Sequence, residues 1–143
     1  MQASQVAVRI PESTVRGATR QADAWSTSID RGPDWLFIRL EPPRGRGDAG
    51  AVERLEDHLW QTIREHGAHR VVLELDLLLA IDDDLIAMMA ALGVRVRDDG
   101  GLLRVCGLER ANLDRLRRSA HAPDLPHFAS RSEAVIARGS VGG

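Results

Sequence analysis

Residues 71–86 read Val71-Val72-Leu73-Glu74-Leu75-Asp76-Leu77-Leu78-Leu79-Ala80-Ile81-Asp82-Asp83-Asp84-Leu85-Ile86, and this stretch decides the fold. Its first five residues form a nearly continuous apolar run, which is typical of a central strand covered on both faces. A helix is predicted to begin near Asp83. Its apolar spacing predicts a buried stripe of Leu85, Met88, Met89, Leu92 and Val96.

The sequence on either side of this stretch continues the alternation of strands and helices. Upstream we expect a hairpin of strands 25–29 and 35–40, and then a helix with Val52, Leu55, Leu59, Trp60 and Ile63 on one face, ended by Gly67. Downstream we expect a strand at 102–106, a helix with Leu113 and Leu116, a short edge strand within 125–128 and a last helix at 130–138. This order predicts an α/β fold: a mixed, largely parallel sheet of about four or five strands, opening with a β-hairpin and packed with about four helices.

The length of 143 residues fits one domain. We expect residues 1–22 to be a flexible tail, residues 23–138 to form the domain, and residues 139–143 to be a frayed end. No apolar run approaches the roughly 20 residues that a membrane span needs, so membrane insertion is not expected. The single cysteine, Cys106, fits a reducing compartment, and we expect a cytoplasmic protein.

Charge and composition exclude several classes of function. All 19 basic residues are arginine, which removes lysine Schiff-base catalysis and any phosphate-binding loop that needs a lysine. The 21 acidic residues are mixed among them, and only five aromatic residues are available to stack on bases. Nucleic acid is therefore not expected as a partner.

Asp82-Asp83-Asp84 lies where the central strand leads into the next helix. One aspartate is expected to cap the helix and another to gain from the helix dipole, whereas the third has no such explanation. Capping alone and an acidic site facing a partner both remain open. A magnesium or phospho-aspartate site would add Glu74 and Asp76, but receiver domains rely on a lysine that is missing here. We find no zinc spacing, no Gly-x-Ser-x-Gly motif and no Walker loop, and expect no enzyme activity, cofactor or metal.

The region from Val71 to Leu108 resembles a STAS domain, the fold of bacterial anti-sigma factor antagonists. That family has an apolar strand ending in Asp and, eight residues later, Asp-Ser-Ser-Gly-Leu at a helix start. Here Glu74 ends the strand, and the segment eight residues later reads Asp82-Asp83-Asp84-Leu85-Ile86. The family's Gly-Gly turn, next strand and final Ser-x-x-Glu-Ala correspond to 100–108 and 130–134, so the resemblance covers about residues 34–138.

The resemblance implies a non-enzymatic regulatory module that binds a protein partner, an anti-sigma factor that is also a serine kinase. The family's phosphorylated serine corresponds to Asp84, its first serine to Asp83 and its glycine to Leu85, so the partner-binding loop is expected to contain Asp82, Asp83, Asp84 and Leu85. Serine phosphorylation cannot switch this chain at that position. Leu85 adds bulk where the family keeps its backbone accessible. The alternative is a STAS scaffold subunit, in a stressosome-like assembly or on the cytosolic side of a lipid transporter; the oligomeric state stays open.

Overall fold

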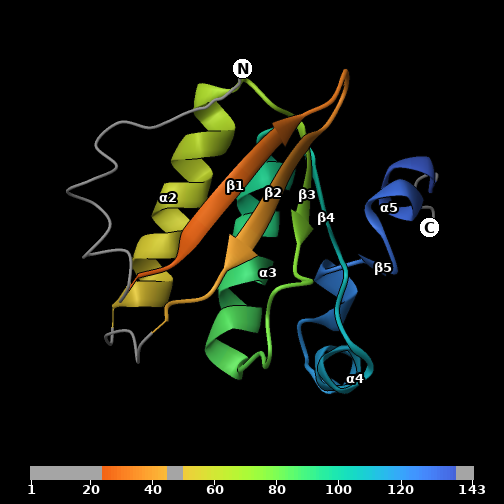
Figure 1. Ribbon diagram of the computed structural model, residues 1–143. Helices are drawn as coiled ribbons and strands as arrows, with labels where there is room; N and C mark the ends of the chain where they lie inside the picture. Colours follow the sequence, from red (N-terminus) through yellow and green to blue (C-terminus); the bar gives the residue numbers. More distant parts are fainter. Residues whose placement is uncertain (1–23, 45–49, 138–143) are drawn as a thin grey trace.

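The computed structural model describes residues 24–44 and 50–137, so the two predicted tails, 1–22 and 139–143, lie outside the described residues. Five strands form one sheet in the order β1-β2-β3-β4-β5 (Figure 1). Only β1 and β2 are antiparallel, and the other neighbours are parallel. The strands are β1 (Ser26–Arg31), β2 (Leu36–Glu41), β3 (Arg70–Glu74), β4 (Leu102–Cys106) and β5 (His127–Phe128).

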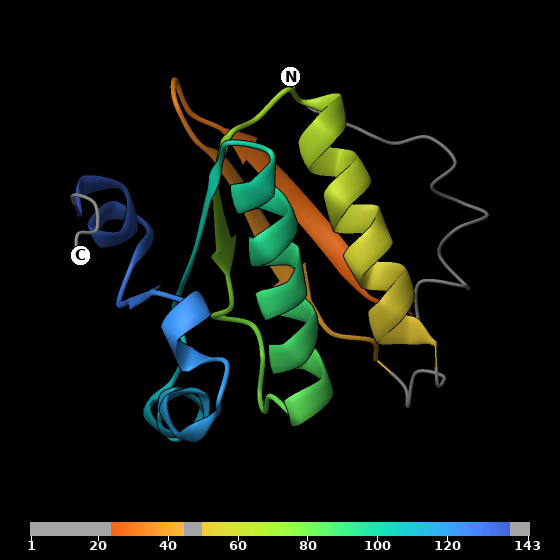
Figure 2. The same cartoon turned by 180° about the vertical axis from the view of Figure 1, so that it is seen from behind.

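Helices cover the two faces of this sheet unequally. One face carries α2 (Ala51–Glu65) and α3 (Asp83–Asp98), which lie side by side across it (Figure 2). The opposite face carries the short helix α5 (Arg131–Ile136), which contacts β3, β4 and β5. Helix α4 (Arg110–Arg118) and the 3-10 helix η1 (Ala122–Asp124) follow β4 and lie beyond its carboxyl end (Figure 1). None of the described helices is long and apolar enough to cross a bilayer.

The predicted hairpin is confirmed. Its strands pair from Ser26 with Glu41 to Arg31 with Leu36, and the turn is closed by the Gly32 amide, which donates to the Trp35 carbonyl at 2.9 Å. Alternate residues of β2 then serve different layers, as period-two alternation requires. Ile38 faces α2 and α3, whereas Phe37 faces away from them.

Helix α2 forms for the reason that its apolar spacing indicated. Leu55, Leu59 and Ile63 are buried against the sheet, and Trp60 packs beside them. The helix ends at a left-handed Gly67 with φ 60°, after which the Ala68 amide donates back to the Ile63 carbonyl at 3.1 Å. This C-terminal motif favours glycine because a side chain at positive φ is strained.

Two apolar clusters flank the sheet. The larger lies between the sheet and α2 and α3, and the smaller lies on the opposite face. Strand β3 supplies Val71 and Leu73 to the first cluster and Val72 to the second, which confirms it as a central strand covered on both faces. The predicted stripe of α3 is buried in the larger cluster: Leu85, Met88, Met89, Leu92 and Val96.

The C-terminal third differs in detail from the prediction. The expected edge strand within 125–128 is only His127–Phe128, because the 3-10 helix η1 precedes it and turns Leu125 into the larger cluster. The last helix is six residues long, from Arg131 to Ile136, rather than 130–138. Ser130 is its N-cap, since its hydroxyl accepts from the Glu133 amide at 3.2 Å.

Candidate functional site

The loop between β3 and α3 spans residues 75–82 at the edge of the sheet where the parallel strands end. Its leucines and isoleucine divide into two sets. Leu75, Leu78 and Ile81 are buried in the core, which anchors the loop at three points. Leu77 is half-exposed and Leu79 is 89% exposed. The loop therefore holds two large apolar side chains at the surface on an anchored backbone.

Asn112 of α4 fixes the outer part of this loop. Its buried side chain accepts from the Ile81 amide through Oδ1 at 3.2 Å and donates to the Leu79 carbonyl through Nδ2 at 3.3 Å. One side-chain amide thus satisfies a donor and an acceptor of a backbone that has no strand to pair with. The contacts of Asn112 with the loop could not be predicted from apolar spacing, because its two partners lie more than 30 residues away along the chain.

Asp82 is the N-cap of α3. Its Oδ1 accepts from the Leu85 amide at 2.8 Å, so the predicted capping role is confirmed for this residue. Asp83 and Asp84 occupy the first helical turn, where the partial positive charge of the helix N-terminus favours carboxylates. Capping accounts for one of the three aspartates and leaves the other two free to face outward.

Asp83 and Asp84 are both exposed at the start of α3. The Asp83 side chain is 87% exposed, and its Oδ1 lies 3.5 Å from Nη2 of Arg115, which comes from α4. An ion pair between two such exposed groups contributes little, about 0–1 kcal/mol. The first turn of α3 therefore presents two carboxylates that are not committed to the fold.

The side chain of Leu85 lies in the core at the start of α3. It is 2% exposed and belongs to the larger apolar cluster, with the other residues of the α3 stripe. The predicted buried stripe is therefore confirmed at this position. The place of Leu85 in the partner-binding loop stays a prediction.

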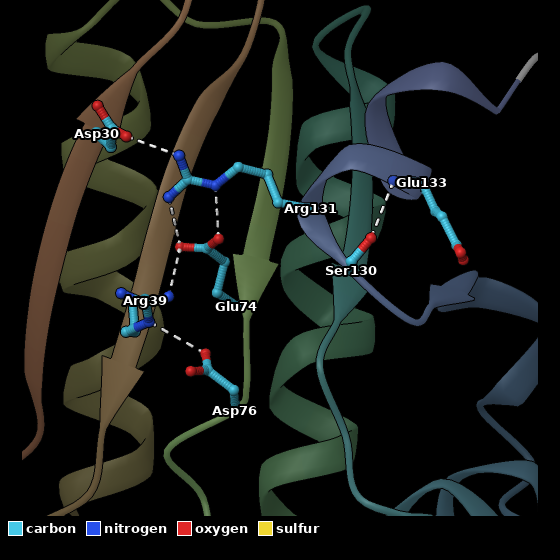
Figure 3. A network of polar contacts seen from close by, with 7 residues as sticks. All are labelled: Asp30, Arg39, Glu74, Asp76, Ser130, Arg131 and Glu133. Carbon is cyan, nitrogen blue, oxygen red and sulfur yellow. Dashed lines mark hydrogen bonds and ion pairs between the residues drawn. The ribbon is translucent and has the colours of Figure 1, made fainter.

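Glu74 and Asp76, the other acids of the hypothetical metal site, are bound by arginines on the opposite side of the sheet (Figure 3). Glu74 is only 4% exposed. Arg131 donates two hydrogen bonds to the Glu74 carboxylate, from Nε to Oε2 at 2.7 Å and from Nη2 to Oε1 at 2.9 Å. Asp76 accepts from Nε of Arg39 at 3.0 Å. In the part of the chain that the structure describes, no group of three or more His, Cys, Asp or Glu side chains could hold a metal ion.

Arg131 also ties the first strand into this network. Its Nη1 donates to Oδ2 of Asp30 at 2.7 Å (Figure 3). Its guanidinium lies 4.1 Å from the centre of the Phe37 ring. The hydrogen bonds to Glu74, ahead of the contact with Asp30, raise the pKa of Arg131 above its usual range. One residue of α5 thus links β1, β2 and β3.

Arg104 and Cys106 extend from β4 onto the same face. The buried Arg104 guanidinium lies 5.3 Å from the ring centres of both Trp35 and Phe128, and it donates to the Ala134 carbonyl of α5. Burial, followed by the charge of Arg70, lowers the pKa of Arg104. Burial also raises the pKa of the Cys106 thiol to about 11, so this cysteine is a protonated core residue and not a nucleophile.

No protein-family model matches the sequence, and no curated protein matches it significantly. Solved structures do match the fold. A STAS-domain anti-sigma factor antagonist from Planctomyces limnophilus aligns with a TM-score of 0.62 at 16% identity, over 76% of this chain and 94% of that one. The chain has the STAS fold. A serine-to-glutamate variant of RsbS from Moorella thermoacetica aligns with a TM-score of 0.63 at 12% identity, over 76% and 91% of the two chains. A structure of the stressosome, described as a signal integration and transduction hub, contains a chain that aligns with a TM-score of 0.62 at 13% identity, over 76% and 92%.

The STAS fold predicted from residues 71–108 is therefore confirmed, with its mixed sheet and opening hairpin. Within this fold, the structure brings Asp82, Asp83 and Asp84 together with the exposed Leu77 and Leu79 on one edge. It separates them from Glu74 and Asp76, which the arginine network occupies. The resulting site combines exposed leucines with exposed carboxylates, and the residues described include no group of three or more His, Cys, Asp or Glu side chains that could hold a metal ion.

Proposed function

We propose that this chain is a non-enzymatic regulatory module that binds an anti-sigma factor through the β3–α3 loop and the first turn of α3. The partner-facing loop contains Asp82, Asp83, Asp84 and Leu85, whose side chain lies in the core, together with the exposed leucines of the loop. The charges of Asp83 and Asp84 weaken this binding, as phosphoserine would. The observation that carries this proposal is the exposure of Asp83 and Asp84 on a backbone anchored by Asn112 and the Asp82 cap. Because these contacts fix the backbone of the loop, the surface loses little conformational entropy when a partner docks.

The proposal includes a fixed regulatory state. Asp83 and Asp84 stand where the family has serines, and a carboxylate lacks the hydroxyl that a kinase would phosphorylate. An aspartate carries one negative charge in a planar group, whereas phosphoserine carries about −1.5 to −2 with three acceptor oxygens. Asp84 therefore imitates the phosphorylated state only in part, and the chain is not switched by serine phosphorylation at this site. The serine-to-glutamate form of RsbS among the structural neighbours supports the compatibility of this fold with an added carboxylate.

A second candidate function is that of a scaffold subunit in a stressosome-like assembly. The observation that favours it is the stressosome chain among the structural neighbours. In that case the same edge would contact other STAS subunits, and no kinase would act on the chain.

The test uses the double variant Asp83→Ser/Asp84→Ser, with Leu85 left in place because it belongs to the core. Calorimetric titration would compare it with the wild type against anti-sigma kinases from the same cell. Serine caps and begins helices well, so the melting curve should change little. Removing the charges of Asp84 and of Asp83, which only the exposed Arg115 offsets, from an interface where they would be desolvated should tighten binding by about a hundredfold. The new serines should accept phosphate.

The matched control is Asp98→Ser/Asp99→Ser, which makes the same chemical change at the opposite end of α3. It should bind like the wild type. If the first variant folds but binds no better and is not phosphorylated, the antagonist proposal fails and the scaffold function takes its place.

A further inference from the structure

The edge that carries the β3–α3 loop has an acidic half, a basic half and two exposed leucines. We call this surface, formed by Leu77, Leu79, Asp82–Asp84 and the exposed side chains of α4, the loop edge. Asn112 holds α4 against the loop backbone, and Arg115 reaches the first turn of α3. The acidic turn and the basic helix are therefore immediate neighbours in space.

The two halves have nearly equal and opposite charge. Asp82, Asp83 and Asp84 give the turn three negative charges. Helix α4 has four arginines and one aspartate, a net charge of +3: Arg110, Asp114, Arg115, Arg117 and Arg118. All five are exposed. Only one contact at 3.5 Å, between Arg115 and Asp83, joins the halves within the chain.

Helical spacing assigns the arginines of α4 to two sides of the helix. Arg115 contacts the start of α3, and Arg118 lies one turn further along the same side. Arg117 lies on the other side, since two residues along the helix correspond to a rotation of about 200° from Arg115. Arg115 and Arg118 thus form the basic half that borders the loop.

We propose that a second copy of this chain docks on the loop edge across a twofold axis. In such an interface the same patch is used twice, so a group away from the axis meets a different group of the other copy, and a group near the axis meets its own counterpart. A patch that is acidic on one side and basic on the other meets its own complement after this rotation. The aspartates of one copy face Arg115 and Arg118 of its partner, and the two Leu79 side chains, each 89% exposed in the single chain, meet near the axis.

The size of the loop edge predicts a weak dimer. One loop, one helical turn and one side of a nine-residue helix place it at the low end of specific interfaces, below about 1,200 Å² in total. A dissociation constant of roughly 10–100 μM is expected for such a contact. The dimer covers Asp83 and Asp84, so a second copy and a protein partner exclude each other. This regulatory consequence, unlike the dimer itself, rests on the proposed function.

Sedimentation velocity of the full chain at concentrations from about 5 to 500 μM tests the dimer directly. The wild type should pass from monomer to dimer over this range, and higher salt should weaken the dimer because the charged groups are exposed. Leu79→Ser should weaken it at least tenfold. Ile136→Ser removes an exposed apolar side chain from α5 on the opposite face and should leave the dimer unchanged. A chain that stays monomeric throughout, or a dimer that tolerates Leu79→Ser, overturns the proposal.

A pair of charge reversals tests the twofold pairing. Asp83→Arg/Asp84→Arg makes the loop edge mainly basic, and Arg115→Asp/Arg118→Asp makes it mainly acidic. Each variant alone should be monomeric, with circular dichroism confirming that it is folded, and an equimolar mixture should form the heterodimer. Failure of the folded mixture to associate overturns the pairing. Loss of kinase binding in the titrations described above would leave these sedimentation results unaffected, so the two proposals fail separately.

Discussion

Leu79 and Leu85 are two leucines six residues apart whose surroundings differ completely. Leu85 is buried in the larger cluster, and Leu79 is almost fully exposed. Leu85→Ala should therefore lower the free energy of unfolding by about 2–5 kcal/mol, because it removes buried surface and leaves a cavity. Leu79→Ala should change it by less than about 0.5 kcal/mol. Urea unfolding of the two variants measures both values, and equal losses would contradict the placement of Leu85 in the core.

His127 gives the fold a dependence on pH. Its Nε2 accepts from the Leu108 amide at 3.1 Å, which only the neutral ring can do. Burial, and then the charge of Arg117, lowers the pKa of His127 from the ordinary 6.5. The unfolded chain therefore takes up this proton at a higher pH than the folded one. The contribution of His127 to the free energy of unfolding is fully present above about pH 6.5. It is lost as the pH falls from 6.5 through the lowered pKa that His127 has in the folded chain.

The variant His127→Gln separates this effect from other titrations. Glutamine offers an uncharged amide oxygen to the Leu108 amide, so the free energy of unfolding should depend less on pH between about 5 and 7 than in the wild type. His121→Gln changes an exposed histidine outside the strands and should keep the wild-type slope. Thermal unfolding at several pH values gives the slopes, and an unchanged slope in His127→Gln would refute the assignment.

At the scale of elements, α5 is attached mainly by arginines. Only Ala134 of its six residues is buried, whereas Arg131 binds Glu74 at its start and Arg104 reaches the Ala134 carbonyl. Arg131→Ala should cost about 3 kcal/mol, because it leaves the Glu74 carboxylate buried without its bidentate partner. This is the low end of the range for a buried pair, since the Arg131 side chain is itself 36% exposed. Chemical denaturation provides the value.

Two comparisons sharpen this measurement. Arg97→Ala breaks an exposed contact with Asp124 at 3.9 Å and should cost less than about 1 kcal/mol. Adding Glu74→Leu to Arg131→Ala should recover part of the loss, because no buried carboxylate then remains with only a 3.8 Å contact to Arg39. A double variant less stable than Arg131→Ala alone would show that Glu74 is not the source of the cost.

The elements that the sequence predicted well are those with a local periodic signal. Strand β3, helix α3 and the hairpin could be placed from apolar spacing and turn residues alone. The arginine network could not, since Arg131 lies 57 residues from Glu74 and 101 from Asp30, and no spacing rule connects them. The 3-10 helix η1 was missed because three residues are too few to show a period.

The candidate site was predictable only in part, for a similar reason. The chain order of Asp82, Asp83 and Asp84 after a buried strand was enough to predict a capped helix start. The exposure of Leu79 was not predictable, because the loop has no regular period that would show which leucines turn inward. Asn112 was missed because its contacts depend on how α4 packs against the loop.

At the scale of the whole molecule, the five strands and two apolar clusters that the structure describes are built from residues 25–135, and the sequence of residues 1–22 shows no apolar period. We therefore expect a variant lacking residues 1–22 to keep the fold, with a change of less than about 0.5 kcal/mol in the free energy of unfolding. The melting temperature should then shift by roughly 1–3 °C. Differential scanning calorimetry of the shortened and full chains provides the comparison, and a fall of many degrees would show that residues 1–22 contribute to the fold.

The contacts of Arg131 with Glu74 and Asp30 can form only after the ribosome has synthesised residue 131. Strand β3 leaves the ribosome 57 residues before the arginine that neutralises its carboxylate. At about 5 to 20 residues per second, translation of this interval takes roughly 3 to 11 seconds. During these seconds the hairpin, β3 and α3 can pack, but Glu74 stays without its bidentate partner. Helix α5 therefore completes this network late in synthesis, and a chain that ends before residue 131 leaves Glu74 with only its 3.8 Å contact to Arg39.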